Sequence, residues 1–400
     1  MYALPLLHKL ISRNCSEIHA TRLNSCLLAV QALTQGAKAS VTSLGRGLNG
    51  PTYDKHKIKR MDRLVSNLHL YQERQSIYQS LARRMLQGLS EPIVLIDWSP
   101  LCADQSWQLL RAALPVGGRS LTLYEEVYPV SKLGNRKVQH QFLDRLASLI
   151  PSDCRPIVVA DSGFRTPFFC YVENTLKWHW LGRIRGRDFL SWADEDDHWF
   201  SAKSLYSKAT TIAKRLGAVH WVRSNTLAGS IVLVRQSKRR RKDLTYTGKV
   251  RQSKRSQVHA KREREPWLLV SSQSLGQRTA KKLVKIYRSR MQIEESFRDS
   301  KAAQYGLGLS QNRRMSEKRR AVLCLLVTLA NFMLWCVGMA GKYTAKAKQV
   351  RVNSSSKREP YSVIFLARLL ITQEHFRLPN KAIEESLNNI KPYMESILCR

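Results

Sequence analysis

EPIVLIDWS, residues 91–99, and PIVVADSGF, residues 156–164, decide the fold. In each stretch a proline precedes a run of aliphatic residues and an aspartate follows it, Asp97 in the first and Asp161 in the second. Short apolar runs bounded by turn-forming residues are typical of strands that are buried on both faces of a sheet. We therefore expect two buried central strands, each with an acidic residue near its carboxyl end.

The sequence around these strands predicts an α/β fold with a mixed sheet. Further strands are expected at residues 107–116, 120–129 and 179–186. Helices are expected at residues 138–150 and 166–180. Gly117 and Gly118 separate the first two of these strands and give a hairpin signal. The order is thus three strands, helix, strand, helix, strand, which favours a sheet with helices packed on it.

An insertion is expected to interrupt the sheet between about residues 187 and 272. It closes with a basic, low-complexity stretch from Arg235 to Arg264, in which VRQSKR occurs at 234–239 and again at 250–255. Two interpretations of this stretch remain open, a basic β-hairpin and an irregular cationic loop. Because the stretch is of low complexity, the sequence does not show which of its basic residues contact DNA.

The charge balance indicates a polyanionic partner. Sixty-seven Lys and Arg residues against thirty Asp and Glu residues give a formal net charge of +37. Such a chain repels itself unless a polyanion offsets its field, and nucleic acid is the usual one. The hydrophobic share of 43% is ordinary, so a folded core is expected. An anionic membrane surface and an RNA-binding role are the alternatives that charge alone leaves open.

Residues 1–85 are expected to form a helical, basic domain. VTSLGRGLNG at 41–50 and KHKIKRMDRLVSNLHL at 55–70 predict a short helix, a glycine-marked turn and a second helix. On the second helix Lys59, Arg60 and Arg63 share one face, and apolar residues recur on the other. This pattern predicts a helix that lies on DNA; a solvated basic face is the alternative.

One apolar stretch is long enough to cross a membrane. Residues 321–341 contain no charged residue. We favour a buried core helix, because Asn331 and the small residues suit packing against protein, and keep a membrane anchor as the alternative. The N-terminal residues show no secretion signal, and the eight cysteines show no zinc-binding spacing. A cytoplasmic location without a membrane partner is therefore expected.

These boundaries predict three regions. They are a helical DNA-binding domain at 1–85, a catalytic domain at 86–345 that contains the insertion, and a helical C-terminal region at 346–400. In the last region SVIFLARLLI, residues 362–371, supplies an apolar segment suited to dimer contacts.

The stretch KKLVKIYRSRMQIEESFRDSK, residues 281–301, contains a third acidic residue of interest. Tyr287, Arg290, Glu294 and Lys301 are spaced three, four and seven residues apart. On one helix running from about residue 278 to 303, these steps return to the same face. The alternative is a surface helix stabilised by an i,i+4 pair between Arg290 and Glu294.

The three acids predict a metal-dependent reaction. If Asp97, Asp161 and Glu294 converge, their carboxylates repel each other unless cations lie between them, and such oxygen ligands select Mg²⁺ or Mn²⁺ over zinc. Two ions about 3.5–4 Å apart can activate a hydroxyl and stabilise the leaving oxygen of a phosphodiester. The phenol, guanidinium and ammonium groups of residues 287, 290 and 301 are then expected to hold DNA phosphates.

These features resemble the DDE transposases of bacterial insertion sequences, in the branch defined by a Y-x2-R-x3-E-x6-K signature (insertion-sequence family four). The cut-and-paste enzymes of composite transposons belong to that branch. Tyr287, Arg290, Glu294 and Lys301 fill all four signature positions. The resemblance extends over nearly the whole chain, through the segments KHKIKRMDRL, IVLIDWS, GRSLTLYE, DSGF, EPWLL and YGLGL.

The resemblance implies an RNase H-like core with a mainly β insertion, and a homodimer that pairs two transposon ends. The implied reaction is 3′ strand hydrolysis, hairpin formation, hairpin opening and strand transfer into target DNA, with Mg²⁺ or in its place Mn²⁺. It also implies that Trp267 stacks on a flipped base, for which packing inside the insertion is the alternative. The implied location is the bacterial nucleoid.

Two other functions share part of this evidence. An RNase H-like nuclease would use the same acids without joining DNA. A catalytically inactive DNA-binding regulator would bind DNA without cutting it; loss of any of the three acids would favour this function, and all three are present.

Overall fold

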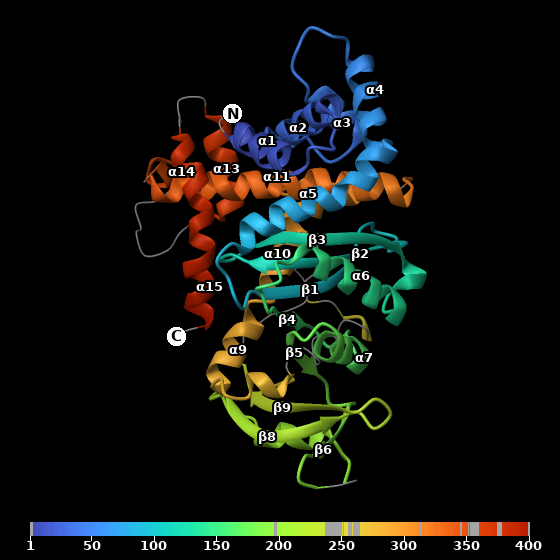
Figure 1. Ribbon diagram of the computed structural model, residues 1–400, viewed down its shortest axis with the longest axis vertical. Helices are drawn as coiled ribbons and strands as arrows, with labels where there is room; N and C mark the ends of the chain where they lie inside the picture. Colours follow the sequence, from blue (N-terminus) through green and yellow to red (C-terminus); the bar gives the residue numbers. More distant parts are fainter. Residues whose placement is uncertain are drawn as a thin grey trace. The chain divides into compact units, whose positions relative to one another are not determined.

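The computed structural model describes residues 3–195, 198–236, 250, 252–254, 258, 265–312, 314–344, 346–350, 352, 360–373 and 378–398. The chain is mixed α/β and divides into two compact units (Figure 1). The first unit consists of Met1–Cys154 with Ser289–Cys399, and the second contains Arg155–Arg288. Each unit is described by itself below.

The first unit is largely helical. Its helices are α1 (Ala3–Asn14), α2 (Ala20–Thr34), α3 (Val41–Arg46), α4 (Asp54–Val65), α5 (Leu68–Leu86), η1 (Val130–Lys132), α6 (Arg136–Leu149), α10 (Met291–Lys301), η5 (Leu309–Gln311), α11 (Glu317–Tyr343), α12 (Lys346–Gln349), α13 (Val363–Thr372), α14 (Asn380–Glu385), η6 (Ser386–Asn389) and α15 (Ile390–Leu398). Its strands are β1 (Ile93–Pro100), β2 (Trp107–Pro115) and β3 (Ser120–Pro129).

The three strands of the first unit form an antiparallel arrangement with β2 in the middle. Helices α5, α6, α10 and α11 all contact β3, and α10 also contacts β1 and β2. Figure 1 shows α5 and α11 lying side by side next to β3, and these two helices contact each other. The sheet is therefore covered by helices that come from both ends of the chain.

The predicted N-terminal pair of helices is confirmed as α3 and α4. Gly45 on α3 lies so close to α4 that an added Cβ would be 2.5 Å from the Cα of Ile58. Met61 and Leu64 on the inner side of α4 are buried. A glycine is required at residue 45 because no side chain fits between the two helix backbones.

The apolar stretch at 321–341 lies in α11, a 27-residue helix. It is long and apolar enough to cross a membrane, but 89% of its most apolar window is buried inside the protein. In the described part of the chain no other helix meets that test. The interpretation as a core helix is therefore confirmed. The seven described cysteines are free thiols, and all but Cys170 are buried.

A buried ion pair lies in the middle of the first unit. Arg111 on β2 and Glu125 on β3 are cross-strand partners, and their side chains are each 1% exposed and 2.7 Å apart. Glu125 also accepts hydrogen bonds from Tyr78 on α5 at 3.0 Å and from Thr328 on α11 at 2.6 Å. The guanidinium of Arg111 lies 4.8 Å from the ring centre of Phe297 on α10. One charge pair thus joins the sheet to three helices.

The second unit is mainly β. Its strands are β4 (Ile157–Ala160), β5 (His179–Ile184), β6 (Phe189–Trp192), β7 (Phe200–Ser201), β8 (Lys214–Trp221), β9 (Leu227–Val234) and β10 (Trp267–Ser271). Its helices are α7 (Thr166–Cys170), the π-helical turn η2 (Tyr171–Thr175), η3 (Ala202–Lys208), η4 (Gln273–Leu275) and α9 (Ala280–Arg288).

The strands of the second unit follow the order β4-β5-β10-β9-β8-β6-β7. Only β4 and β5 are parallel, and each later neighbour pairs antiparallel with the one before it. Helix α9 contacts β5, β8 and β9. The predicted mixed sheet is confirmed, because β5 pairs with a parallel strand on one side and an antiparallel strand on the other.

The structure corrects two predictions. The first buried strand does not end near Asp97; β1 continues to Pro100, because Trp98, Ser99 and Pro100 stay paired with β2. The predicted helix from 278 to 303 is two helices, since α9 ends at Arg288 and α10 begins at Met291. The apolar periodicity of the sequence continues across this break and does not reveal it.

We expect the substitution Arg111→Met to lower the free energy of unfolding by about 3–5 kcal/mol, because it leaves the buried Glu125 carboxylate without its cation. Urea unfolding of the whole chain measures the change. Arg298→Gln is the matched control, because Arg298 is 69% exposed in its pair with Glu295 and should contribute less than about 1 kcal/mol. Equal losses in the two variants would contradict a structural role for the buried pair.

Candidate active site

Arg290 brings two of the predicted acids together. Its Nη1 lies 3.0 Å from Oδ2 of Asp97, and its Nη2 donates to Oε1 of Glu294. The side chains of Arg290 and Asp97 are only 12% and 14% exposed, and that of Glu294 is 40% exposed. A carboxylate from strand β1 and one from helix α10 therefore share a single guanidinium within the first unit.

The positions of these groups follow from local structure. Asp97 lies within β1, opposite Arg111 on β2, and its Oδ1 accepts the backbone N–H of Trp98 at 2.9 Å. Arg290 is the residue immediately before α10, and Glu294 lies in the first turn of that helix. A carboxylate is favoured there by the unpaired N–H groups of the helix start. Sheet pairing fixes one acid and the start of a helix fixes the other.

Lys301, at the end of α10, also reaches β1. Its Nζ donates to Oγ of Ser99 at 2.5 Å and to the carbonyl oxygen of Pro100 at 3.1 Å. Burial and, to a smaller extent, the nearby positive charge of Arg111 lower the pKa of Lys301 to about 8, against the opposing effect of Asp97. The ammonium group is thus held beside the strand that carries Asp97, and it remains mostly charged at neutral pH.

Tyr287 does not share a helix with the other three signature residues, so the predicted single stripe is wrong. It lies on α9 in the second unit, buried, and its ring makes an edge-to-face contact with Trp267 at 5.1 Å and 78°. Arg290, Glu294 and Lys301 all belong to the first unit. The predicted i,i+4 pair between Arg290 and Glu294 is present.

Asp161 follows β4 directly, in the second unit. Its Oδ1 accepts the backbone N–H of Gly163 at 2.7 Å, so the carboxylate closes a tight turn. A Cβ at residue 163 would lie 2.9 Å from that oxygen, so a larger residue there would displace the Asp161 carboxylate. Ser162 accepts a hydrogen bond from Nε of Arg185 at 2.9 Å. The turn presents a half-buried carboxylate at the end of a buried strand.

Trp267 opens β10 and is half-buried. Its ring contacts Tyr287, and the guanidinium of Arg183 lies 5.9 Å from the ring centre. The indole therefore packs against an aromatic ring and a cation without being enclosed. Its stacking on a DNA base remains a prediction.

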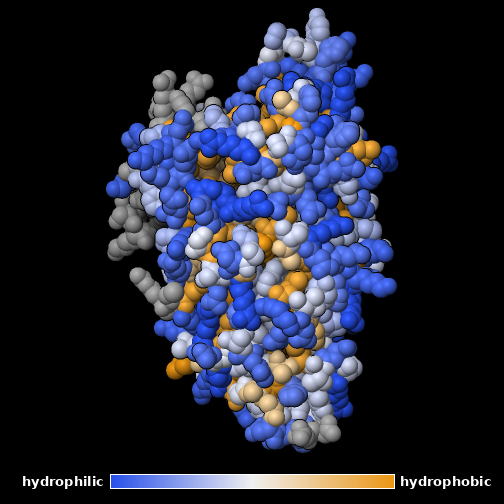
Figure 2. All heavy atoms as spheres, in the orientation of Figure 1, coloured by the Kyte–Doolittle hydropathy of each residue, from blue (hydrophilic) through white to orange (hydrophobic). Residues whose placement is uncertain are grey.

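The basic face of α4 is exposed, as its periodicity predicts. Lys59, Arg60 and Arg63 are all exposed. Figure 2 shows mostly hydrophilic side chains over α4, at the upper right. Of the three, Arg60 is tied down by a hydrogen bond to Oγ of Ser25 on α2 at 3.1 Å. The exposed face is confirmed, and its contact with DNA remains a prediction.

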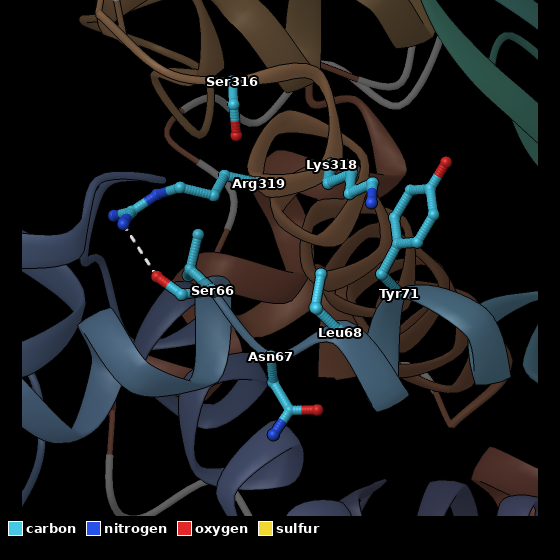
Figure 3. Close-up of a pocket in the computed structure, with 8 residues that line it drawn as sticks. Ser66, Asn67, Leu68, Tyr71, Ser316, Lys318 and Arg319 are labelled. Atoms are coloured by element: carbon cyan, nitrogen blue, oxygen red, sulfur yellow. Dashed lines mark hydrogen bonds between the residues drawn. The ribbon is translucent and has the colours of Figure 1, made fainter.

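A small pocket of about 180 Å³ lies where α4 and α5 meet the start of α11 (Figure 3). Arg319 on α11 donates to Oγ of Ser66 at 2.7 Å and pairs with Asp62 at 2.6 Å. The amino group of Lys318 lies 5.7 Å from the ring centre of Tyr71. These contacts make the pocket a junction that anchors α4 to the core helix.

The basic stretch from Arg235 to Arg264 lies outside the described residues, except for 235–236, 250, 252–254 and 258. Neither the β-hairpin nor the irregular loop is tested there.

Among the buried charged residues of the first unit that the sequence patterns did not single out, Arg111 and Glu125 bear directly on the site. Arg111 lies beside both Asp97 and Lys301 in the structure, and Glu125 neutralises it. The sequence does contain a signal for this pair. An arginine inside WQLLRAALPV and a glutamate inside SLTLYEEVYP would be costly in buried strands unless they were paired.

The donor set suits a hard divalent ion. In the described part of the chain no three Asp, Glu, His or Cys side chains are grouped as a ready metal site. Asp97 and Glu294 nevertheless point their carboxylate oxygens at one cationic group, and oxygen donors of this kind fit Mg²⁺ or Mn²⁺. The arrangement can therefore hold positive charge between two acids on different elements.

Comparison with known proteins gives one family. The family model described as "Transposase DDE domain" matches residues 89–332, more than half of the chain. The matched span includes Asp97, Asp161 and Glu294 and parts of both units. The mixed α/β architecture agrees with the RNase H-like fold expected for that family. A search of curated proteins finds no match.

The lowered pKa of Lys301 predicts a pH dependence of stability. Between about pH 8 and 10.5 the unfolded chain holds this proton and the folded chain releases it, so the contribution of Lys301 to the free energy of unfolding rises with pH. Urea unfolding of wild type and Lys301→Met across this window measures it. The free energy of unfolding of wild type should increase with pH relative to that of Lys301→Met. A difference between the two that does not change with pH would contradict the burial of Lys301.

Proposed function

Because this chain belongs to the family of DDE transposases, we propose that it excises a transposable element and joins it to target DNA. The observation that carries the proposal is the meeting of Asp97 and Glu294 around one cation, within the matched span. Asp161, the acid at the end of β4, is proposed as the third member of the set. We propose Mg²⁺ as the natural ion, with Mn²⁺ able to replace it.

In this proposal the carboxylates of Asp97, Asp161 and Glu294 hold the metal. A divalent ion held there would polarise the attacking hydroxyl and offset the negative charge on the leaving oxygen of the phosphodiester. The fixed positions of Asp97 on a paired strand and Glu294 on the first turn of α10 limit how far either carboxylate can move. Such preorganisation favours one cleavage geometry over others.

Positive side chains near the acids are proposed to position the DNA backbone. Arg290 offers a planar guanidinium suited to two phosphate oxygens, and Lys301 offers a point charge beside β1. Tyr287 and Trp267, which pack edge to face in the second unit, are proposed as phosphate and base contacts respectively. A half-buried indole can stack on an unpaired base without rearranging its own strand.

The proposed reaction is a sequence of in-line displacements at phosphorus. Water attacks one strand and frees a 3′ hydroxyl, which then attacks the opposite strand to form a hairpin. A second water opens the hairpin, and the same 3′ hydroxyl attacks target DNA. In each attack the nucleophile loses a proton as its P–O bond forms, and the leaving oxygen takes up a proton as its own P–O bond breaks, so a single site can serve all four steps.

End recognition is proposed for the N-terminal helices and dimer contacts for the C-terminal ones. The exposed Lys59, Arg60 and Arg63 on α4 supply positive charge at helical spacing for one DNA groove or backbone. Phe365 on α13 is 45% exposed beside Tyr361, which offers apolar surface for a second copy. A homodimer would place one site at each transposon end.

Cleavage of the DNA that flanks the gene tests this function. With Mg²⁺, purified protein should cut at the boundary of an inverted repeat and give hairpin or joined products. Asp97→Asn and Glu294→Gln should each lower the rate by at least about 100-fold, since loss of outer-shell partners alone costs about 10- to 100-fold at metal sites.

Arg298→Gln, one turn beyond Glu294 on the exposed side of α10, is the control and should retain cleavage. Cutting without joining would identify a nuclease. Binding without any cutting by wild type would leave a DNA-binding regulator and sink the catalytic proposal.

The salt dependence of DNA binding tests the face of α4. Each phosphate contact contributes about 0.9 to the slope of log affinity against log salt concentration on duplex DNA. Lys59→Gln and Arg63→Gln should each reduce the magnitude of that slope by about this amount, as measured by fluorescence anisotropy. Lys381→Gln, at an 85% exposed position on α14, should leave it unchanged. Unchanged slopes in all three variants would exclude α4 from the interface.

A further inference from the structure

Two acidic groups of the first unit depend on a single arginine. Asp97 and Glu294 carry two negative charges, and Arg290 contributes one positive charge to both of them. Neither Asp97 nor Arg290 is more than 14% exposed, so water screens their interaction only weakly. The guanidinium is therefore the principal counter-ion of this pair of carboxylates.

Lys301, a second cation near Asp97, donates its hydrogen bonds to groups other than the acids. Nζ of Lys301 donates to Ser99 and to the carbonyl oxygen of Pro100. Arg111 is occupied by Glu125 at 2.7 Å. Arg290, by contrast, binds carboxylate oxygens of Asp97 and Glu294 that a divalent ion would use.

A divalent ion and a guanidinium cannot share these oxygens without cost. Mg²⁺ and Mn²⁺ bind carboxylate oxygens at about 2.0–2.2 Å, well inside the 3.0 Å contact between Arg290 and Asp97. Arg290 is only 12% exposed, so a divalent ion placed beside it would also meet a weakly screened repulsion. Replacement of the guanidinium by the ion is favoured over addition.

We propose that Arg290 competes with the divalent ion for Asp97 and Glu294, and that a DNA phosphate relieves this competition by taking up the guanidinium. Arg290 thereby makes metal binding depend on bound DNA. The inference rests on the proposed function and assigns to Arg290 a positioning role in addition to phosphate contact. Reciprocity follows, because the metal then strengthens DNA binding by the same factor.

The geometry allows this exchange. Glu294 is 40% exposed, so the bridge opens to solvent on the side of α10 where a phosphate can approach. A guanidinium binds phosphate at least as readily as carboxylate, through two parallel N–H donors. Arg290 precedes the first residue of α10, so its side chain can move while the helix and Glu294 keep their places.

Mn²⁺ titration of the full chain tests the proposal. Calorimetry, with and without a duplex that contains the gene's flanking inverted repeat, gives the Mn²⁺ affinity of wild type, Arg290→Gln and the control Arg298→Gln. Asp97→Asn defines binding at other sites, which is subtracted. Conditions that prevent turnover, such as a duplex with a non-cleavable linkage at the element boundary, separate binding from reaction.

Without DNA, Arg290→Gln should bind Mn²⁺ about 10-fold more tightly than wild type, and Arg298→Gln should match wild type. Added DNA should increase the Mn²⁺ affinity of wild type by about 10-fold, which lies within the 5- to 150-fold range usual for coupled sites. It should leave the Mn²⁺ affinity of Arg290→Gln unchanged. Arg290→Lys keeps the positive charge but lacks the two parallel N–H donors, so its Mn²⁺ affinity should lie between those of wild type and Arg290→Gln. This variant also controls for a folding defect in Arg290→Gln.

Equal or weaker Mn²⁺ binding by Arg290→Gln would overturn the inference, because the guanidinium would then be helping the acids to bind metal. Wild type that binds Mn²⁺ equally with and without DNA would also overturn it, even if it cleaves DNA, and the proposed function would stand. Absence of Mn²⁺ binding in every variant and condition would sink both.

Discussion

The buried charge pair between Arg111 and Glu125 is the constraint on which the first unit depends. A guanidinium and a carboxylate that are each 1% exposed must stay in contact, because either one alone would be costly inside the core. Their contact fixes β2 against β3, and Tyr78 and Thr328 extend it to helices α5 and α11. The sheet and its helices are thus held in one arrangement by polar groups that have few alternatives.

The acidic site is a consequence of that arrangement. Arg111 lies opposite Asp97 in the β1–β2 ladder and packs on Phe297 of α10, so strand and helix are positioned by the same residue. Arg290 and Lys301 then reach β1 from the two ends of α10. Arg290, Lys301 and Arg111 thus form a cluster of positive charges around Asp97. A family of DNA-processing enzymes is the context in which such a cluster is useful.

The sequence predicts much of this fold, and the exceptions have physical reasons. Buried strands, the glycine-marked helix pair and the long core helix follow from apolar runs and turn residues, because those patterns depend on local structure. The break between α9 and α10 was missed because residues 289 and 290 have no helix-breaking side chain. Arg290, Glu294 and Lys301 could be chosen from their spacing, whereas the role of Arg111 required its partners, which come from distant positions in the chain.

The most direct test of the account is a crystal structure of the protein with Mn²⁺ and a duplex that carries the element end, with anomalous scattering used to locate the metal. We predict an anomalous peak bonded to oxygens of Asp97, Asp161 and Glu294, with the Arg290 guanidinium on a DNA phosphate. A complex in which Arg290 still bridges Asp97 and Glu294, with no metal on either carboxylate, would contradict the account.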